Sequence, residues 1–201
     1  MKTNTKKISI LFFICFSLLL LPETASASRA PLMLGIKTGY SMPADGDLES
    51  TMLTGLEAQF AVTDQRVFLV EIDYGFKSGI SGSYSGNVSQ SGNAISQFAV
   101  VSLMQFKGGT RKAGLYYGAG LAYTNYRISS IVTTASGAMF VVNAKPSRFG
   151  GLFTLGYGGR SGLYTEARYL FAGKKMWNPL INTKTDLGGF SLNAGYRLAL
   201  K

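Results

Sequence analysis

The chain has 201 residues, of which 15% are charged and 25 are glycine, and it has the size of about one domain. It contains no histidine, which excludes a Ser-His-Asp catalytic site and a His-ligated zinc site. Its formal net charge is +10, but the basic residues neither cluster on a helix nor alternate with base-stacking aromatics. We therefore expect no nucleic-acid partner, and an anionic lipid surface fits the charge better.

The first segment has the features of a secretory signal peptide. Lys6 and Lys7 precede an apolar run over 8–21, and a small-x-small pattern ends at Ala27. The alternative, a retained membrane anchor, is disfavoured because this run is short for a spanning helix. We predict a cleaved signal peptide over residues 1–27 and a single barrel domain over 28–201. The only cysteine, Cys15, lies in the signal peptide, so the exported chain is expected to have no disulfide.

The next features in chain order are segments with alternating apolar residues, the period that indicates β-strands. Residues 94–126 show it most clearly, as two arms around a short glycine-containing turn. Each arm is long enough to cross a bilayer at a tilt, which takes about 9–11 residues. The predicted strands lie at about 32–41, 51–62, 66–77, 94–106, 113–126, 148–158, 163–172 and 187–200.

The links between these strands alternate in length. Short turns are expected at 63–65, 107–112 and 159–162, and long polar loops at 42–50, 78–93, 129–147 and 173–186. In an up-and-down barrel alternate links lie at opposite ends, so all the long loops share one end and both termini share the other. Transmembrane barrels have this asymmetry. The predicted fold is all-β, an eight-stranded antiparallel up-and-down transmembrane β-barrel.

Polar and apolar residues occupy opposite faces of these strands. We expect the apolar face to point to lipid and the polar face to fill the lumen, because eight strands leave space only for side chains. The predicted lumen ion-pair network is Glu57, Glu71, Asp73, Glu166, Arg168 and Arg197, with Gln59 beside it. Two alternatives remain open: a soluble lipocalin-like barrel with this face in water, and acid–base chemistry by Glu71 and Asp73.

Aromatic residues are expected to form two girdles at the bilayer interfaces. The girdle near the short turns comprises Phe60, Phe68, Phe106, Tyr117, Tyr157 and Tyr196. The girdle near the long loops comprises Tyr74, Phe76, Phe98, Tyr123, Phe149, Phe171 and Phe190. In the strand at 94–106 this places Phe98, Val100, Met104 and Phe106 on the lipid-facing side.

The last strand alternates through Phe190, Leu192, Ala194, Tyr196, Leu198 and Leu200 and is followed by Lys201. With the eight strands, this pattern over residues 30–201 resembles the small outer-membrane barrels of Gram-negative bacteria, of the OmpA-barrel, OmpX and OmpW type. Proteins of that type often end on an aromatic residue, whereas this sequence has Leu200 and Lys201 there. The resemblance implies a location in the cell outer membrane. It also implies insertion by the barrel-assembly machinery and contact with lipopolysaccharide. We expect the barrel without the peptidoglycan-binding domain of the long OmpA arrangement.

Four functions remain open from the sequence. We favour a monomeric structural or surface-interaction barrel with a side-chain-filled lumen, acting through its external loops, with no catalytic residue, metal or cofactor. The alternatives are a narrow channel for small solutes, an enzyme acting on envelope lipid, and the lipocalin-like binder. Lys174, Lys175 and Trp177 are the candidates for an external contact with lipopolysaccharide phosphates, although we favour the alternative that Trp177 packs on the barrel rim.

Overall fold

The computed structural model describes residues 32–46, 48–76, 78–84, 88–107, 113–178 and 183–200. The expected signal peptide at 1–27 lies outside the described residues, as does most of the expected turn at 107–112. Within the described residues, no helix is both long and apolar enough to cross a membrane. The described chain is a set of antiparallel strands.

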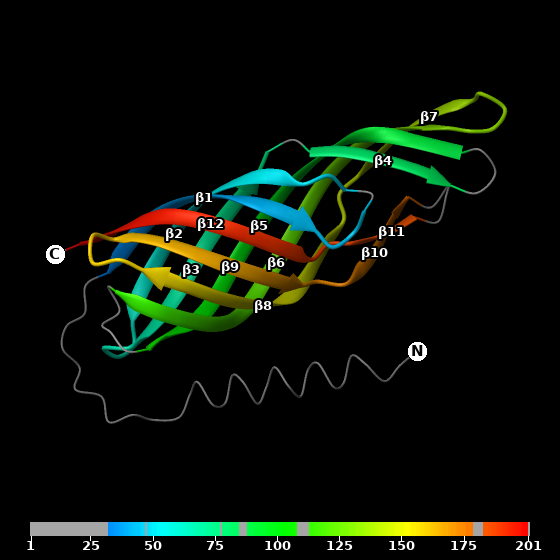
Figure 1. Ribbon diagram of the computed structural model, residues 1–201. Coiled ribbons are helices and arrows are strands. Elements are labelled where there is room, and N and C mark those ends of the chain that lie inside the picture. The colour runs from blue at the N-terminus through cyan, green and yellow to red at the C-terminus, as the bar shows by residue number, and fades with distance from the viewer. Residues whose placement is uncertain are drawn as a thin grey trace, which may run out of the picture.

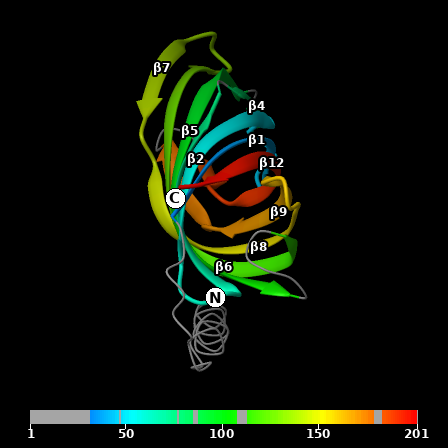
Figure 2. The same ribbon diagram turned by 90° about the vertical axis from the view of Figure 1, so that its left-hand side faces the viewer.

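Eight strands close into a ring (Figures 1 and 2). Around the ring the order is β5, β3, β2, β1, β12, β9, β8 and β6, and β6 then pairs with β5. Their bounds are β1 Met33–Pro43, β2 Thr51–Ala61, β3 Arg66–Gly75, β5 Val88–Lys107, β6 Gly114–Thr133, β8 Ser147–Gly158, β9 Leu163–Phe171 and β12 Gly189–Ala199. Each overlaps one of the eight predicted strands, and β5 and β6 extend beyond their predicted bounds at one end.

The first and last strands close the ring. β1 pairs with β12 in one continuous register from Met33 opposite Ala199 to Pro43 opposite Gly189. The start of β1 and the end of β12 therefore lie at the same end of the barrel, together with the short connections at 62–65 and 159–162. We call this the turn end, and the opposite end the outer end.

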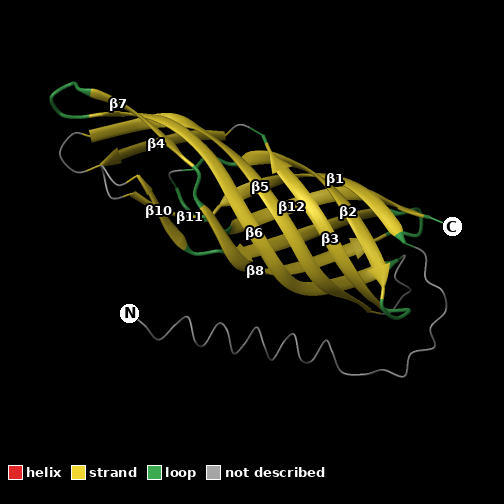
Figure 3. Ribbon diagram, turned by 180° about the vertical axis from the view of Figure 1, so that it is seen from behind, coloured by secondary structure: helices red, strands yellow, loops and turns green. Residues whose placement is uncertain are grey.

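The strands continue past the barrel at the outer end, where the sequence pattern indicated loops. β5 and β6 are each 20 residues long and pair throughout, and their outer halves are flanked by β4 (Ser78–Tyr84) and β7 (Met139–Ala144). This four-stranded sheet, which we call the outer ribbon, extends beyond the ring in Figures 1 and 3. A short hairpin of β10 (Lys174–Asn178) and β11 (Thr183–Asp186) lies near it.

The loop predictions at 78–93, 129–147 and 173–186 are therefore wrong. Their glycine, serine and asparagine residues are typical of loops, yet alternate positions in the ribbon are buried, among them Ile80, Ala94, Ile128 and Val132. Backbone pairing between two 20-residue strands overrides the local preference of these residues, because β propensity depends strongly on context.

The orientation of β5 is a second correction. Phe98, Val100, Met104 and Phe106 point into the barrel and are buried, whereas Val101 on the opposite face is 43% exposed. The placement of Phe98 and Phe106 in the lipid-facing girdles is wrong. Alternation defines two faces of a strand but not which one points inward, and here the register with β3 places Met104 opposite the buried Val67. The other girdle residues lie on the outer surface of the ring, fully or partly exposed.

Candidate functional site: the filled lumen

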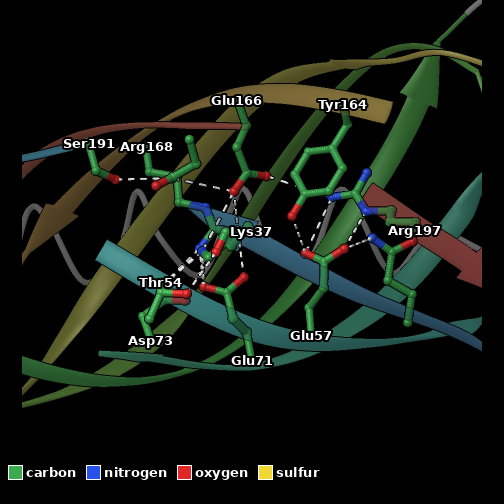
Figure 4. Close-up of polar contacts among 12 residues, drawn as sticks. Lys37, Thr54, Glu57, Glu71, Asp73, Tyr164, Glu166, Arg168, Ser191 and Arg197 are labelled. Atoms are coloured by element: carbon green, nitrogen blue, oxygen red, sulfur yellow. Dashed lines mark hydrogen bonds and ion pairs between the residues drawn. The ribbon is translucent and has the colours of Figure 1, made fainter. Parts of the chain in front are cut away.

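The lumen contains seven charged side chains that five neighbouring strands point inward. Glu57 comes from β2, Glu71 and Asp73 from β3, Glu166 and Arg168 from β9, and Arg197 from β12. The structure brings these six sequence-predicted residues together and adds Lys37 from β1, which the sequence reasoning missed. We call the seven residues the lumen network (Figure 4). All seven are buried.

Lys37 is the centre of one half of the lumen network. Its Nζ lies 2.5 Å from Glu71 Oε1, 2.9 Å from Asp73 Oδ2 and 3.8 Å from Glu166 Oε1. Arg168 binds the same carboxylates from the other side. One of its terminal nitrogens lies 2.6 Å from both Glu71 Oε2 and Glu166 Oε1, and the other donates to Glu71 Oε1. Glu71 is therefore held by two cations, one from β1 and one from β9, strands that are separated in the ring by β12.

Arg197 is the centre of the other half. Its Nε donates to Glu57, and its guanidinium lies over the Tyr164 ring with 3.5 Å between the guanidinium carbon and the ring centroid. The Tyr164 hydroxyl donates to Glu57 at 3.0 Å, and the Tyr116 hydroxyl donates to Glu166 at the same distance. Glu166 also lies 3.8 Å from Arg197, so this carboxylate joins the two halves. Neither tyrosine was a sequence candidate, although Tyr164 lies on the same face of β9 as Glu166 and Arg168.

The lumen network has four carboxylates and three cations, so its formal net charge is −1. The excess is nearest Asp73, whose Oδ1 has no hydrogen-bond partner among the described atoms. Buried charges are tolerated only when they are paired and hydrogen-bonded, and removing one partner is far more costly than removing both. We therefore expect the lumen network to lose stability sharply when a single partner is removed.

Glycines in the barrel wall make space for these large side chains. A Cβ added at Gly55 would lie 2.0 Å from Asp73 Oδ1 and 2.9 Å from Lys37 Cε. A Cβ at Gly156 would lie 2.3 Å from the Tyr116 ring. Such contacts are not compatible with a close-packed interior, so these positions need glycine for close approach rather than for turn geometry.

Clusters of buried apolar side chains flank the lumen network toward both ends of the barrel. At the turn end the cluster is Val67, Leu69, Met104, Phe106, Tyr116 and Tyr164. Toward the outer end a larger cluster includes Leu53, Phe98, Val100, Tyr126, Leu152 and Leu170. Between this cluster and Asp73 lies a cavity of about 40 Å³, the size of one or a few water molecules. The lumen therefore contains both charged and apolar side chains, and not a uniformly polar set.

The expected external contact residues lie in the β10–β11 hairpin at the outer end. Lys174 and Lys175 are exposed, and Arg148 donates a hydrogen bond to the Lys174 carbonyl. Trp177 belongs to β10, but its side chain lies outside the described part of the chain. The structure therefore does not bring the expected lysine pair and tryptophan into one described site.

The chemistry open to the lumen network is restricted by its enclosure. Glu71 and Asp73 are buried and paired with cations, and clusters of apolar side chains lie toward both ends of the barrel from them. The described residues contain no group of three His, Cys, Asp or Glu side chains arranged to hold a metal ion. Paired, enclosed carboxylates of this kind have the features of structural ion pairs rather than of an acid–base pair.

Comparison with known proteins shows the fold. No protein-family model matches the chain, and no curated protein sequence matches it either. Among solved structures, the chain is similar to the outer membrane protein OprG from Pseudomonas aeruginosa. That match has a TM-score of 0.56 and 11% identity, over 88% of this chain and all of that one. It is also similar to Neisserial surface protein A, with a TM-score of 0.52 and 14% identity, over 84% and 97% of the two chains. The fold is that of the small eight-stranded outer-membrane β-barrels.

Proposed function

We propose that the chain is an integral outer-membrane barrel with a closed lumen that acts at the cell surface through its outer ribbon. The observation that carries the proposal is the filling of the lumen, in which a charged layer is enclosed between two apolar layers. Such an interior offers no continuous path for a solute and no access for a substrate. The surface at the outer end is then the part of the molecule left free for contacts.

The outer ribbon has the features of a contact surface. Met139 and Val141 on β7 are 73% and 70% exposed, with Phe140 and Ile131 beside them. β7 pairs with β6 on one side only, so its other edge has backbone groups that no described strand pairs. An exposed strand edge with apolar side chains can pair with a strand of another protein.

The other candidate functions have less support. The enclosed lumen argues against a solute channel and against an envelope-lipid enzyme. A lipocalin-like barrel would have its apolar side chains inside, whereas Ile36, Leu56 and Ile72 are more than 60% exposed on the outer surface. Export by a signal peptide cleaved after Ala27, insertion by the barrel-assembly machinery and a monomeric state complete the proposal.

Two measurements test membrane insertion and lumen closure. The outer-membrane fraction is run on SDS gels with and without boiling, and we expect a heat-dependent change in mobility. A soluble periplasmic protein without this change would overturn insertion. The purified barrel in a planar lipid bilayer is expected to give no ion conductance, and reproducible conductance steps would overturn the closed lumen.

A third measurement tests the outer ribbon. Cells producing the protein are expected to partition into hexadecane more than cells producing a variant with Met139, Phe140 and Val141 replaced by serine. Val62→Ser, at the turn end, is the control and should behave as wild type. Equal partitioning of the ribbon variant and wild type, with both inserted in the membrane, would contradict a role of the ribbon in apolar contacts.

A further inference from the structure

The cavity on the outer-end side of the lumen network has a lining of two kinds. Asp73 and Arg168 contribute charged groups to it, and Ser41 and Ser191 contribute hydroxyl groups. Apolar side chains of the outer cluster form the rest of its wall. Its volume is about 40 Å³. A buried water molecule needs roughly 10–15 Å³ of such volume, so the cavity accommodates about three waters at most.

Two polar atoms of the charged residues at this cavity have no protein partner. Asp73 Oδ1 accepts no hydrogen bond and Arg168 Nε donates none among the described residues. Both residues are only 4% exposed, so bulk solvent does not satisfy these atoms. The other polar atoms of the two side chains are paired, Asp73 Oδ2 with Lys37 and the terminal nitrogens of Arg168 with Glu71 and Glu166. Ion pairing therefore leaves over one buried acceptor and one buried donor.

Further polar groups lie on the strands beside Arg168. Thr154 on β8 and Ser191 on β12 are its neighbours in the strand register, and Ser41 on β1 lies opposite Ser191. Thr154 Oγ1 also has no hydrogen-bond partner among the described residues. Ser191 Oγ accepts a hydrogen bond from the Asn193 amide at 3.3 Å, so its own proton is free to be donated. This side of the lumen is therefore polar across four adjacent strands (Figure 4).

The chemistry of the two unpartnered atoms selects the occupant of the cavity. It has to donate a hydrogen bond to Asp73 Oδ1 and accept one from Arg168 Nε. A monovalent cation would offset the formal net charge of −1, but it accepts no hydrogen bond and the Arg168 guanidinium would repel it. An apolar occupant would leave both atoms unpaired, which is costly in a buried site. Water meets both requirements, and buried waters typically make about three hydrogen bonds.

We propose that this cavity is a binding site for about one to three ordered water molecules, which join Asp73 and Arg168 to the hydroxyls of Ser41 and Ser191. The bound water extends the lumen network toward the outer end and completes the hydrogen bonding of its charged groups. The site is built only from inward side chains, so the inference does not depend on the proposed role of the outer ribbon.

The first test uses crystals of the protein purified from the outer-membrane fraction, exposed to xenon gas or soaked in rubidium chloride. We expect ordered water within hydrogen-bond distance of Asp73 Oδ1 and Arg168 Nε, and neither xenon nor rubidium in the cavity. The control is Met104→Ala, which removes a buried side chain from the apolar cluster at the turn end. Its new cavity should take up xenon, because apolar cavities stay dry.

Each other result in the wild-type crystals would overturn the proposal. Xenon in the cavity would show that it is dry, and rubidium would show a site for monovalent cations. A cavity without density for water, xenon or rubidium would show that the unpartnered atoms of Asp73 and Arg168 are not bridged at all.

The second test counts long-lived waters in the detergent-solubilised protein by magnetic relaxation dispersion of water oxygen-17. Leu152→Phe enlarges a side chain that lines the cavity, so the count should fall by about one to three. Leu121→Phe is the matched control on the outer surface, where Leu121 is 56% exposed, and should leave the count unchanged. An unchanged count for Leu152→Phe, with its heat-dependent mobility intact, would overturn the proposal. If that variant does not fold, the wild-type crystals decide alone.

Discussion

Replacement of Lys37 by methionine tests the electrostatics of the lumen network, because methionine keeps most of the side-chain volume and removes only the charge. The Lys37 ammonium lies within 3 Å of both Glu71 and Asp73. Without it, Arg168 is the remaining cation near these carboxylates, and it lies 3.6 Å from Asp73. Removing one partner of a buried ion pair typically costs about 3–5 kcal/mol, so we expect the free energy of unfolding to fall by that amount.

The assay is urea unfolding of the protein refolded in lipid vesicles, with the folded fraction taken from the unboiled gel band. Lys37→Met/Asp73→Asn removes one charge of each sign, so it should recover about 1–3 kcal/mol of the loss. Lys107→Met, which removes an exposed charge at the turn end, should change stability by less than about 0.5 kcal/mol. A loss below about 1 kcal/mol for Lys37→Met, or no recovery in the double variant, would refute the electrostatic account.

Three further predictions use the same unfolding assay. Gly55→Ala should destabilise the barrel by about 1–3 kcal/mol because its Cβ enters the lumen network, whereas Gly46→Ala, with no atom within 4 Å of its added Cβ, should be neutral. Phe106→Ala should cost about 3–5 kcal/mol and Phe149→Ala much less, because Phe106 is 1% exposed and Phe149 74%; equal losses would contradict the inward orientation of β5. Ile72→Lys, at a 67% exposed outward position, should cost about 2–4 kcal/mol in vesicles, and a neutral result would contradict contact with lipid.

The ring of strands could be predicted because the pattern that indicates each strand lies within that strand's own sequence. Alternation with period two recurs along each strand and depends only on which neighbours are apolar. The same pattern identified the inward carboxylates of β2, β3 and β9. Lys37 was missed although the signal was present: Leu34, Ile36 and Tyr40 are outward, which puts Lys37 on the inner face. Its neighbours on the inner face are Gly35 and Gly39, so β1 has only one polar side chain there and its sequence does not indicate a polar face.

The orientation of β5 and the outer ribbon could not be predicted because they depend on contacts distant in sequence. Both faces of β5 contain apolar residues, so the inward face is determined by its register with β3 and β6. The ribbon combines residues of low β propensity with pairing partners about 40 positions away, such as Ser91 opposite Ile131. Local composition does not indicate pairing with a distant strand, and the polar segments were therefore interpreted as loops.

The charges inside the barrel also favour one register between the strands that close the ring. β1 and β12, the first and last strands of the ring in chain order, pair with each other, and Lys37 and Arg197 both point inward. A slip of one residue along β1 would turn its side chains to the opposite face, so Lys37 would face lipid and Ile36 the lumen. A lysine or arginine facing the bilayer midplane costs about 2–4 kcal/mol, and the carboxylates left behind would lose a partner as well. If β1 and β12 had apolar side chains on both faces, a one-residue slip would have no such cost. The buried charges therefore favour one register between β1 and β12.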